Sequence, residues 1–105
     1  MNVSIRQSPA ATVSSLPWAK EEVLAFVLYY KQRIHAPACT MVASWTRELI
    51  DLALTHEGRH YLPYQPHATQ TQFDRAYPEA ATLRALRAQL DPSKKFSNAM
   101  WERYL

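Results

Sequence analysis

Residues 23–33 read VLAFVLYYKQR, and this stretch decides the fold class that the sequence predicts. It is rich in β-branched and aromatic residues, which is typical of a β-strand. Successive side chains of a strand point to opposite faces of the sheet. Both alternate sets are apolar here, namely Val23, Ala25, Val27 and Tyr29 on one side and Leu24, Phe26, Leu28 and Tyr30 on the other. We therefore expect a strand that is covered on both faces.

The sequence after this strand predicts a long helix and a second strand. Pro37 ends the first strand region, and a helix is expected from about residue 38 to residue 57, with Gly58 as its C-terminal cap. Its predicted buried stripe consists of Met41, Trp45, Leu49 and Leu52. Residues 59–64 predict a short strand, antiparallel to the first and stopped by Pro63 and Pro66.

Three short helices are expected in the C-terminal third. Thr69 or Thr71 can cap the first, which runs through Tyr77. Pro78 opens the second, with Leu83, Leu86 and Leu90 on its buried side, and Ser93 or Ser97 starts the third. The predicted fold class is α+β, with a small antiparallel sheet, one longer helix and three short C-terminal helices. Residues 1–20 lack periodicity and are expected to form a loose arm, whereas residues 21–105 form one domain.

Composition excludes several classes of protein. With 48% hydrophobic and 20% charged residues among 105, the chain is globular rather than disordered. Its net charge of +3 is spread along the sequence, so we expect no nucleic-acid partner. Cys39 is the single cysteine, which excludes an internal disulfide and suits a reducing cytoplasm. No transmembrane segment is expected, because no apolar stretch approaches the roughly 20 residues that a bilayer requires.

Sites for phosphate or metal have little support in the sequence. Gly58 is the only glycine, whereas loops that wrap a pyrophosphate are glycine-rich, so no phosphate cradle is predicted. The four histidines lack the spacing of metal ligands, and no metal site is expected. Arg84 and Arg87 lie three residues apart on a predicted helix. They could bind a phosphate, or their stems could cover the core.

The run from Tyr61 to His67, YLPYQPH, is the sharpest candidate site. A strand that ends in two prolines and carries phenol, amide and imidazole groups can direct polar contacts into a cleft. The alternative is a strand terminus with two half-buried tyrosines, Tyr61 and Tyr64.

Several blocks in the last part of the chain resemble one protein family. They are GRHYLPY at residues 58–64, Ala76-Tyr77-Pro78, Leu90-Asp91-Pro92, Phe96-Ser97-Asn98 and the MWERYL ending at residues 100–105. Together they resemble the C-terminal part of FAD-linked oxidoreductases of the vanillyl-alcohol oxidase type. The resemblance is closest to the sugar-lactone oxidases and the decaprenylphosphoryl-ribose oxidase branch. It is dense over residues 58–105 and weaker over residues 21–57.

The resemblance implies specific roles for three residues. In such enzymes an N-terminal domain holds FAD, and a C-terminal cap domain with an antiparallel sheet forms the substrate side of the flavin. Tyr61 matches an aromatic position that lines the flavin and substrate pocket. Tyr64 matches a position where some relatives carry a lysine facing the pyrimidine end of the flavin, and His67 one where a relative carries a cationic residue. The FAD-binding half has no counterpart in this sequence, and no residue is assigned as a covalent flavin anchor.

Two functions are therefore expected from the sequence. The first is the substrate-cap portion of an FAD-dependent oxidoreductase that oxidises a sugar, sugar lactone or similar alcohol. Alone, this chain would not be catalytic, no catalytic residue is assigned, and FAD would be held by a domain on another polypeptide or within a homo-oligomer. The second is a non-catalytic interaction module that homodimerises or binds a partner chain through the edge of its apolar strand.

Overall fold

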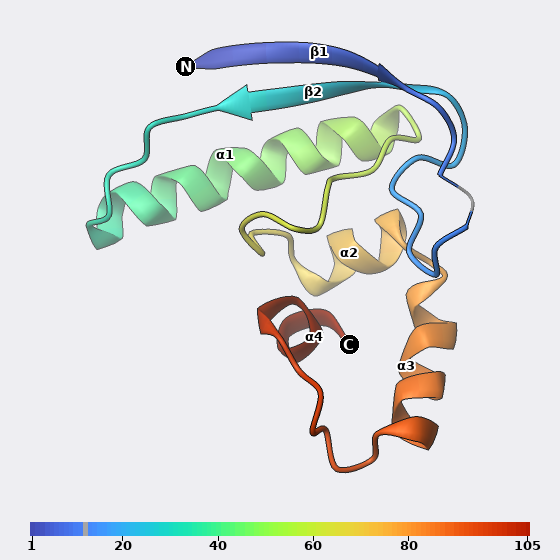
Figure 1. Ribbon diagram of the computed structural model, residues 1–105. Helices are drawn as coiled ribbons and strands as arrows, with labels where there is room; N and C mark the ends of the chain where they lie inside the picture. The colour runs from blue at the N-terminus through green and yellow to red at the C-terminus, as the bar shows by residue number, and fades with distance from the viewer. Residues whose placement is uncertain (12) are drawn as a thin grey trace.

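The computed structural model describes residues 1–11 and 13–105, and within them the chain forms two strands and four helices (Figure 1). The elements are β1 (Asn2–Ser8), β2 (Val23–Tyr29), α1 (Ala36–Thr55), α2 (Gln70–Ala76), α3 (Ala80–Leu90) and α4 (Ala99–Tyr104). The strands pair antiparallel in one sheet, which confirms the α+β class with a small sheet, one long helix and three short ones. In this described part, every helix is too short or too polar to cross a bilayer.

The partner of the apolar strand differs from the prediction. Residues 59–64 form turns and irregular backbone, so the strand expected there is wrong, and β1 pairs with β2 instead. The Tyr77 hydroxyl donates a hydrogen bond to the carbonyl of His60, so this backbone acceptor is not available for pairing with a strand. Pro63 in addition has no N–H for a sheet ladder. In β1, Val3 and Ile5 alternate with polar residues, which is the pattern of a strand with one apolar side.

The described residues of the N-terminal segment pack into the fold, where the sequence predicted a loose arm over residues 1–20; Thr12, which falls within that prediction, lies outside the described residues. Beyond β1, Ala19 is fully buried and its carbonyl accepts a hydrogen bond from the Ala11 N–H at 2.8 Å. The Arg59 guanidinium donates to the carbonyl of Pro17 at 2.5 Å. The contact between Arg59 and Pro17 joins residues that are 42 positions apart, and local sequence periodicity does not predict such a contact.

Helix α1 is closed at both ends by local contacts. The His35 imidazole accepts a hydrogen bond from the Ala38 N–H at its start. At its end, Glu57 adopts a left-handed φ of 59°, and the Gly58 N–H donates to the Ala53 carbonyl at 2.8 Å. Gly58 is therefore not the left-handed residue. It matters because a Cβ there would lie 3.1 Å from the Ala53 oxygen.

The sides of the helices that face the core also differ from the prediction. Met41 and Leu52 of the expected stripe on α1 are more than half exposed, whereas Ala38, Val42 and Ile50 are buried. On α3, Leu86 and Leu90 are exposed and Arg87 is buried. Each of these helices has apolar or long side chains on two sides. The position of the neighbouring elements decides which side is covered, and helical periodicity alone does not contain that information.

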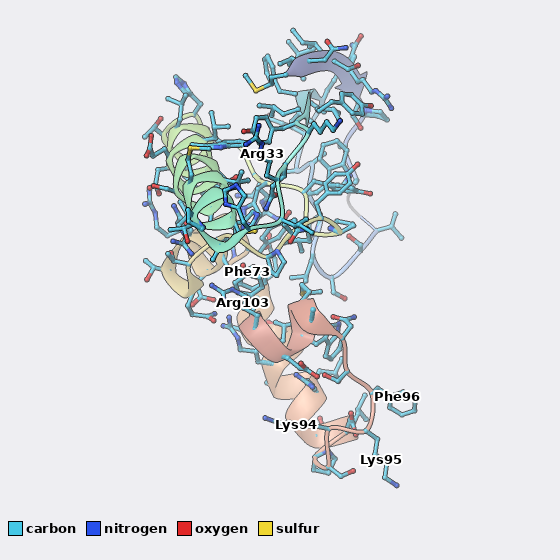
Figure 2. All side chains as sticks on the ribbon, turned by 90° about the vertical axis from the view of Figure 1, so that its left-hand side faces the viewer. Arg33, Phe73, Lys94, Lys95, Phe96 and Arg103 are labelled. Carbon is cyan, nitrogen blue, oxygen red and sulfur yellow. The ribbon has the colours of Figure 1, made fainter. Side chains whose placement is uncertain are left out.

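Three aromatic rings pack together where α2 meets α4. Phe73 of α2 stacks on Tyr104 of α4 with ring centroids 4.4 Å apart and an interplanar angle of 4°, and Tyr77 contacts Phe73 at 5.5 Å. All three rings are buried. Figure 2 shows Phe73 in the middle of the molecule, between α1 and the C-terminal helices. Phe96, Lys94 and Lys95 lie at the end of the molecule that is farthest from the sheet.

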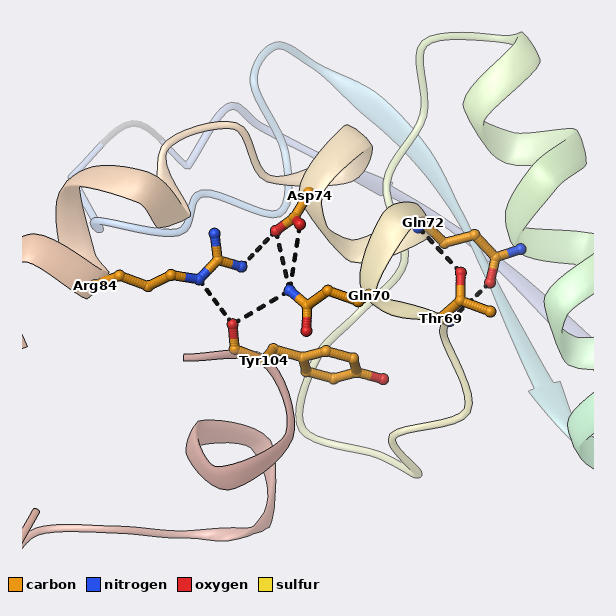
Figure 3. Close-up of polar contacts among 6 residues, drawn as sticks. All are labelled: Thr69, Gln70, Gln72, Asp74, Arg84 and Tyr104. Atoms are coloured by element: carbon orange, nitrogen blue, oxygen red, sulfur yellow. Dashed lines mark hydrogen bonds and ion pairs between the residues drawn. The ribbon is translucent and has the colours of Figure 1, made fainter.

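Polar contacts join the three short helices around this aromatic core (Figure 3). The Tyr104 carbonyl accepts hydrogen bonds from Arg84 at 2.9 Å and from Gln70 at 3.4 Å, and Asp74 pairs with the Arg84 guanidinium. Thr69 caps α2 in a reciprocal capping box with Gln72, which confirms the first of the two expected caps. The short C-terminal helix is thereby tied to both α2 and α3.

Candidate functional site

Three aromatic side chains lie together at the turn at residues 61–64, two of them exposed tyrosines and the third the half-buried Trp18. The Tyr61 ring lies 5.6 Å from the ring of Tyr64 and 5.7 Å from that of Trp18, both in edge-to-face geometry. Tyr61 is 51% exposed and Tyr64 is 70% exposed. We call Trp18, Tyr61 and Tyr64 the aromatic cluster. Because the two tyrosine rings are accessible and close together, the cluster offers an apolar surface with phenol groups for contact with a planar ligand or another chain.

A buried arginine holds the chain just before this cluster. The Arg59 side chain is 2% exposed, donates to both carboxylate oxygens of Glu79 at 2.8 and 3.1 Å, and lies over the Tyr77 ring at 4.9 Å. Burial alone would raise the pKa of Glu79, but the hydrogen bond and charge of Arg59 bring that pKa below its usual range. Burial also raises the pKa of Tyr77 far above its usual value, so its hydroxyl remains a hydrogen-bond donor to His60.

The end of the same segment is held by hydrogen bonds from two helices. Arg47 of α1 donates to the His67 carbonyl at 2.7 Å, and the Tyr104 hydroxyl donates to the Ala68 carbonyl at 2.8 Å. Thus the segment between Arg59 and Ala68 is fixed at both ends, while Tyr61 and Tyr64 point outward between these anchors. A turn built in this way presents its side chains with little loss of conformational entropy on binding.

His67 has a different setting from Tyr61 and Tyr64, since its carbonyl accepts a hydrogen bond from Arg47 of α1. Among the described residues, no ring contact joins it to the aromatic cluster. Burial lowers its pKa, and the nearby charges of Arg47 and Arg103 lower it further. The imidazole is therefore mostly neutral at neutral pH, unlike the cationic residue that the resemblance places there.

The two arginines of α3 are engaged within the fold. Arg84 binds Asp74 and the Tyr104 carbonyl, and Arg87 is 6% exposed with its guanidinium 4.9 Å from the centre of the Trp101 ring. These contacts favour the packing alternative over phosphate binding for both residues. No group of three or more potential metal ligands comes together in the part of the chain that the structure describes.

A second candidate surface lies on the sheet. The register places Val3 opposite Leu28 and Ile5 opposite Phe26, so these side chains share one face with Leu24. We call these five residues the outer sheet face. Phe26 is 61% exposed, Leu24 62% and Ile5 60%, whereas Val23, Ala25 and Val27 on the other face are half-buried. The expected cover on both faces of β2 is thus present on one face only. Exposed apolar groups gathered in this way usually mark an interaction site.

Sequence reasoning found Tyr61 and Tyr64 but missed Trp18 and Arg59. Trp18 follows Pro17 in a stretch rich in Ser, Ala and Pro, and an isolated tryptophan there was the available signal of a packed segment. Arg59 carried no signal, because a buried arginine depends on a carboxylate and a carbonyl far away in the sequence. Comparison of the chain with protein-family models, with curated proteins and with solved structures found no match.

Proposed function

We propose that this chain is the substrate-cap portion of an FAD-dependent oxidoreductase and that it acts with an FAD-binding domain supplied by another polypeptide. One observation carries the proposal. The residues that resemble the flavin and substrate pocket of this family, Tyr61 and Tyr64, are exposed, lie side by side on a turn fixed by Arg59, and contact the half-buried ring of Trp18 through Tyr61. A cap needs this arrangement, because its ring contacts must face outward toward a cofactor held elsewhere.

The residues present fit the ring of a flavin and leave its phosphates to the partner. The aromatic cluster can contact a planar ring, and the Tyr64 phenol can donate a neutral hydrogen bond to it. Gly58 is the only glycine in these 105 residues, so we assign the loop that wraps the pyrophosphate to the FAD-binding domain. When bound, the flavin would accept a hydride from the carbinol carbon of a sugar-like substrate.

The test begins with the coding sequence immediately upstream, which should encode a glycine-rich FAD-binding domain. Co-expression of that domain with this chain should yield a yellow complex that oxidises a sugar or sugar lactone. The absence of such a coding sequence, together with tight stoichiometric binding of FAD by the isolated chain, would refute the division of roles.

Variants of the aromatic cluster test the site within that complex. Tyr64→Lys should raise the reduction potential of the flavin, because an ammonium stabilises the anionic reduced ring more than a neutral phenol does. Tyr61→Ala should weaken substrate binding and change the flavin absorbance. Tyr29→Ala is the matched control, since Tyr29 is 53% exposed but lies in the sheet. Equal effects of all three substitutions would contradict the proposed site.

A second proposed function, an interaction module, is favoured by a different observation. The outer sheet face is exposed, and in the described residues each strand of the sheet has a single neighbour. A two-stranded sheet is at best marginally stable alone. Pairing with a further strand would satisfy the free backbone groups of β2, as in recognition by strand addition. Hydrogen exchange of residues 23–29 with and without a candidate partner tests this function, because an added strand protects their amides.

A further inference from the structure

We infer that a second copy of this chain pairs with the free edge of β2, antiparallel and centred on Phe26. The inference rests on the second proposed function and names the partner. It is independent of the flavin proposal, because the edge of β2 and the aromatic cluster are formed by different residues.

The two free edges of the sheet differ in how well they are protected against pairing with another strand. Natural sheets discourage edge pairing with charged residues, prolines or bulges. β1 carries Arg6 in its middle, whereas the seven residues of β2 include no charged residue and no proline. Among the described residues, no backbone hydrogen bond reaches β2 except from β1. The β2 edge is therefore the one suited to accept a strand.

The second support is the charge at the two ends of β2. Glu21 and Glu22 precede the strand, and Lys31 and Arg33 follow it. None of the four belongs to an ion pair, since the ion pairs among the described residues are Arg59–Glu79 and Arg84–Asp74. An antiparallel second copy brings the acidic end of one strand to the basic end of the other, twice, as a twofold axis requires. A parallel arrangement would bring like charges together.

The register follows from the same symmetry. With Phe26 opposite Phe26 of the second copy, Glu21 lies opposite Lys31, and Leu24 lies opposite Leu28. The exposed apolar side chains become cross-strand neighbours, and such aromatic and aliphatic pairs stabilise sheets. The result is a four-stranded sheet with β1 at both outer edges, above the size at which sheets become stable.

The surroundings of the basic end can receive the incoming acidic residues. A recess of about 360 Å³ lies between the end of β2 and the start of α1, and its lining includes Tyr30, Lys31, Arg33, His35 and Met41. Met41 is 54% exposed, and Tyr30, which follows β2, contacts Trp45 of α1 at 5.6 Å. The apolar surface of the strand thus continues onto α1, so a second copy would cover part of both.

Charge reversal and its rescue test this arrangement in the full chain. Light scattering after size exclusion, from low to high micromolar concentration, should give a dimer. Glu21→Lys and Lys31→Glu should each weaken it by about tenfold, because two symmetric attractions become repulsions. The double variant with both substitutions should restore the original affinity. Both side chains are exposed, so the fold tolerates the changes. Lys95→Glu, the same charge change at the opposite tip of the molecule (Figure 2), should have no effect.

Three results would overturn the inference. They are a monomer over the whole concentration range, a dimer that ignores both reversals, and a dimer in which residues 23–29 exchange their amide hydrogens as fast as in the monomer. If the chain is a monomer and a different polypeptide protects the amides of residues 23–29, the partner is not a second copy, but the proposed interaction function is supported. Free exchange of residues 23–29 in every complex would remove both.

Discussion

Substitution of Tyr104 separates the packing of its ring from the hydrogen bond of its hydroxyl. The side chain is 4% exposed, stacks on Phe73 at 4.4 Å, and donates to the Ala68 carbonyl at 2.8 Å. Tyr104→Phe keeps the stack and removes one donor, and the Ala68 oxygen still accepts from Arg103 at 3.4 Å. We expect this variant to lose about 1 kcal/mol of unfolding free energy.

Tyr104→Ala should lower the unfolding free energy far more, because it also removes a buried ring that stacks on Phe73. Deleting a buried aromatic ring costs about 3–5 kcal/mol. Small domains have only about 5–15 kcal/mol of stability, so this variant should be largely unfolded or lose α4. The ratio between the two losses therefore measures how much of the attachment of α4 comes from packing.

Urea unfolding, followed by circular dichroism and by tryptophan fluorescence, measures both losses. Trp101 lies in α4, three residues before Tyr104, so fluorescence also reports release of this helix. Tyr29→Phe is the control, since Tyr29 is 53% exposed and only accepts a long 3.5 Å contact from Arg6. Equal losses of unfolding free energy in the Phe and Ala variants, or a loss of less than about 1 kcal/mol in the Ala variant, would contradict the packing role of the Tyr104 ring.

Two further predictions concern the end of α1 and the half-buried His60 and His67. Glu57→Gly should stabilise the fold by about 0.5–1 kcal/mol in thermal unfolding, because Glu57 has a φ of 59° that glycine adopts without strain, whereas Glu48→Gly inside the helix should destabilise it. A loss of stability in Glu57→Gly would contradict the left-handed cap. Burial lowers the pKa of His60 and of His67 below 6.5, so the unfolded chain takes up protons that the folded chain resists, and the unfolding free energy should fall as pH drops through about 6.5. A double His60→Gln, His67→Gln variant should flatten this fall of the unfolding free energy, measured in urea titrations between about pH 7.5 and about pH 5.5. The same substitution at the exposed His56 is the control and should leave the fall in place. An unchanged fall in the double variant would refute the assignment of the pH effect to His60 and His67.

The pH effect can be separated from that of the carboxylates. The pKa of Asp91 is lowered by hydrogen bonds from the backbone N–H groups of Phe96 and Lys95, and the pKa of Glu79 lies below its ordinary value of 4.5. Groups with depressed carboxylate pKa values stabilise the fold at neutral pH and lose that contribution only in more acidic solution. The histidine effect therefore appears first as the pH is lowered.

The candidate site could be predicted in part. Tyr61 and Tyr64 stood out because two prolines interrupt an aromatic segment, and the structure brings their rings together. The strand expected to carry them does not form, because the Tyr77 hydroxyl binds the His60 carbonyl and the Arg59 side chain ties the start of this segment to the Pro17 carbonyl instead. Trp18 completes the cluster from a region that local patterns assigned to a loose arm.

The sequence by itself determined the local features of this protein. The apolar run of β2, the Thr69–Gln72 capping box and the helix lengths depend on contacts within a few residues, which propensity and capping rules describe. Only the tertiary structure decided which strand pairs with β2, which side of α1 is buried and why Arg59 lies inside the molecule. Those outcomes depend on groups far apart in the chain, because several apolar surfaces compete for few partners and the burial of one leaves another exposed.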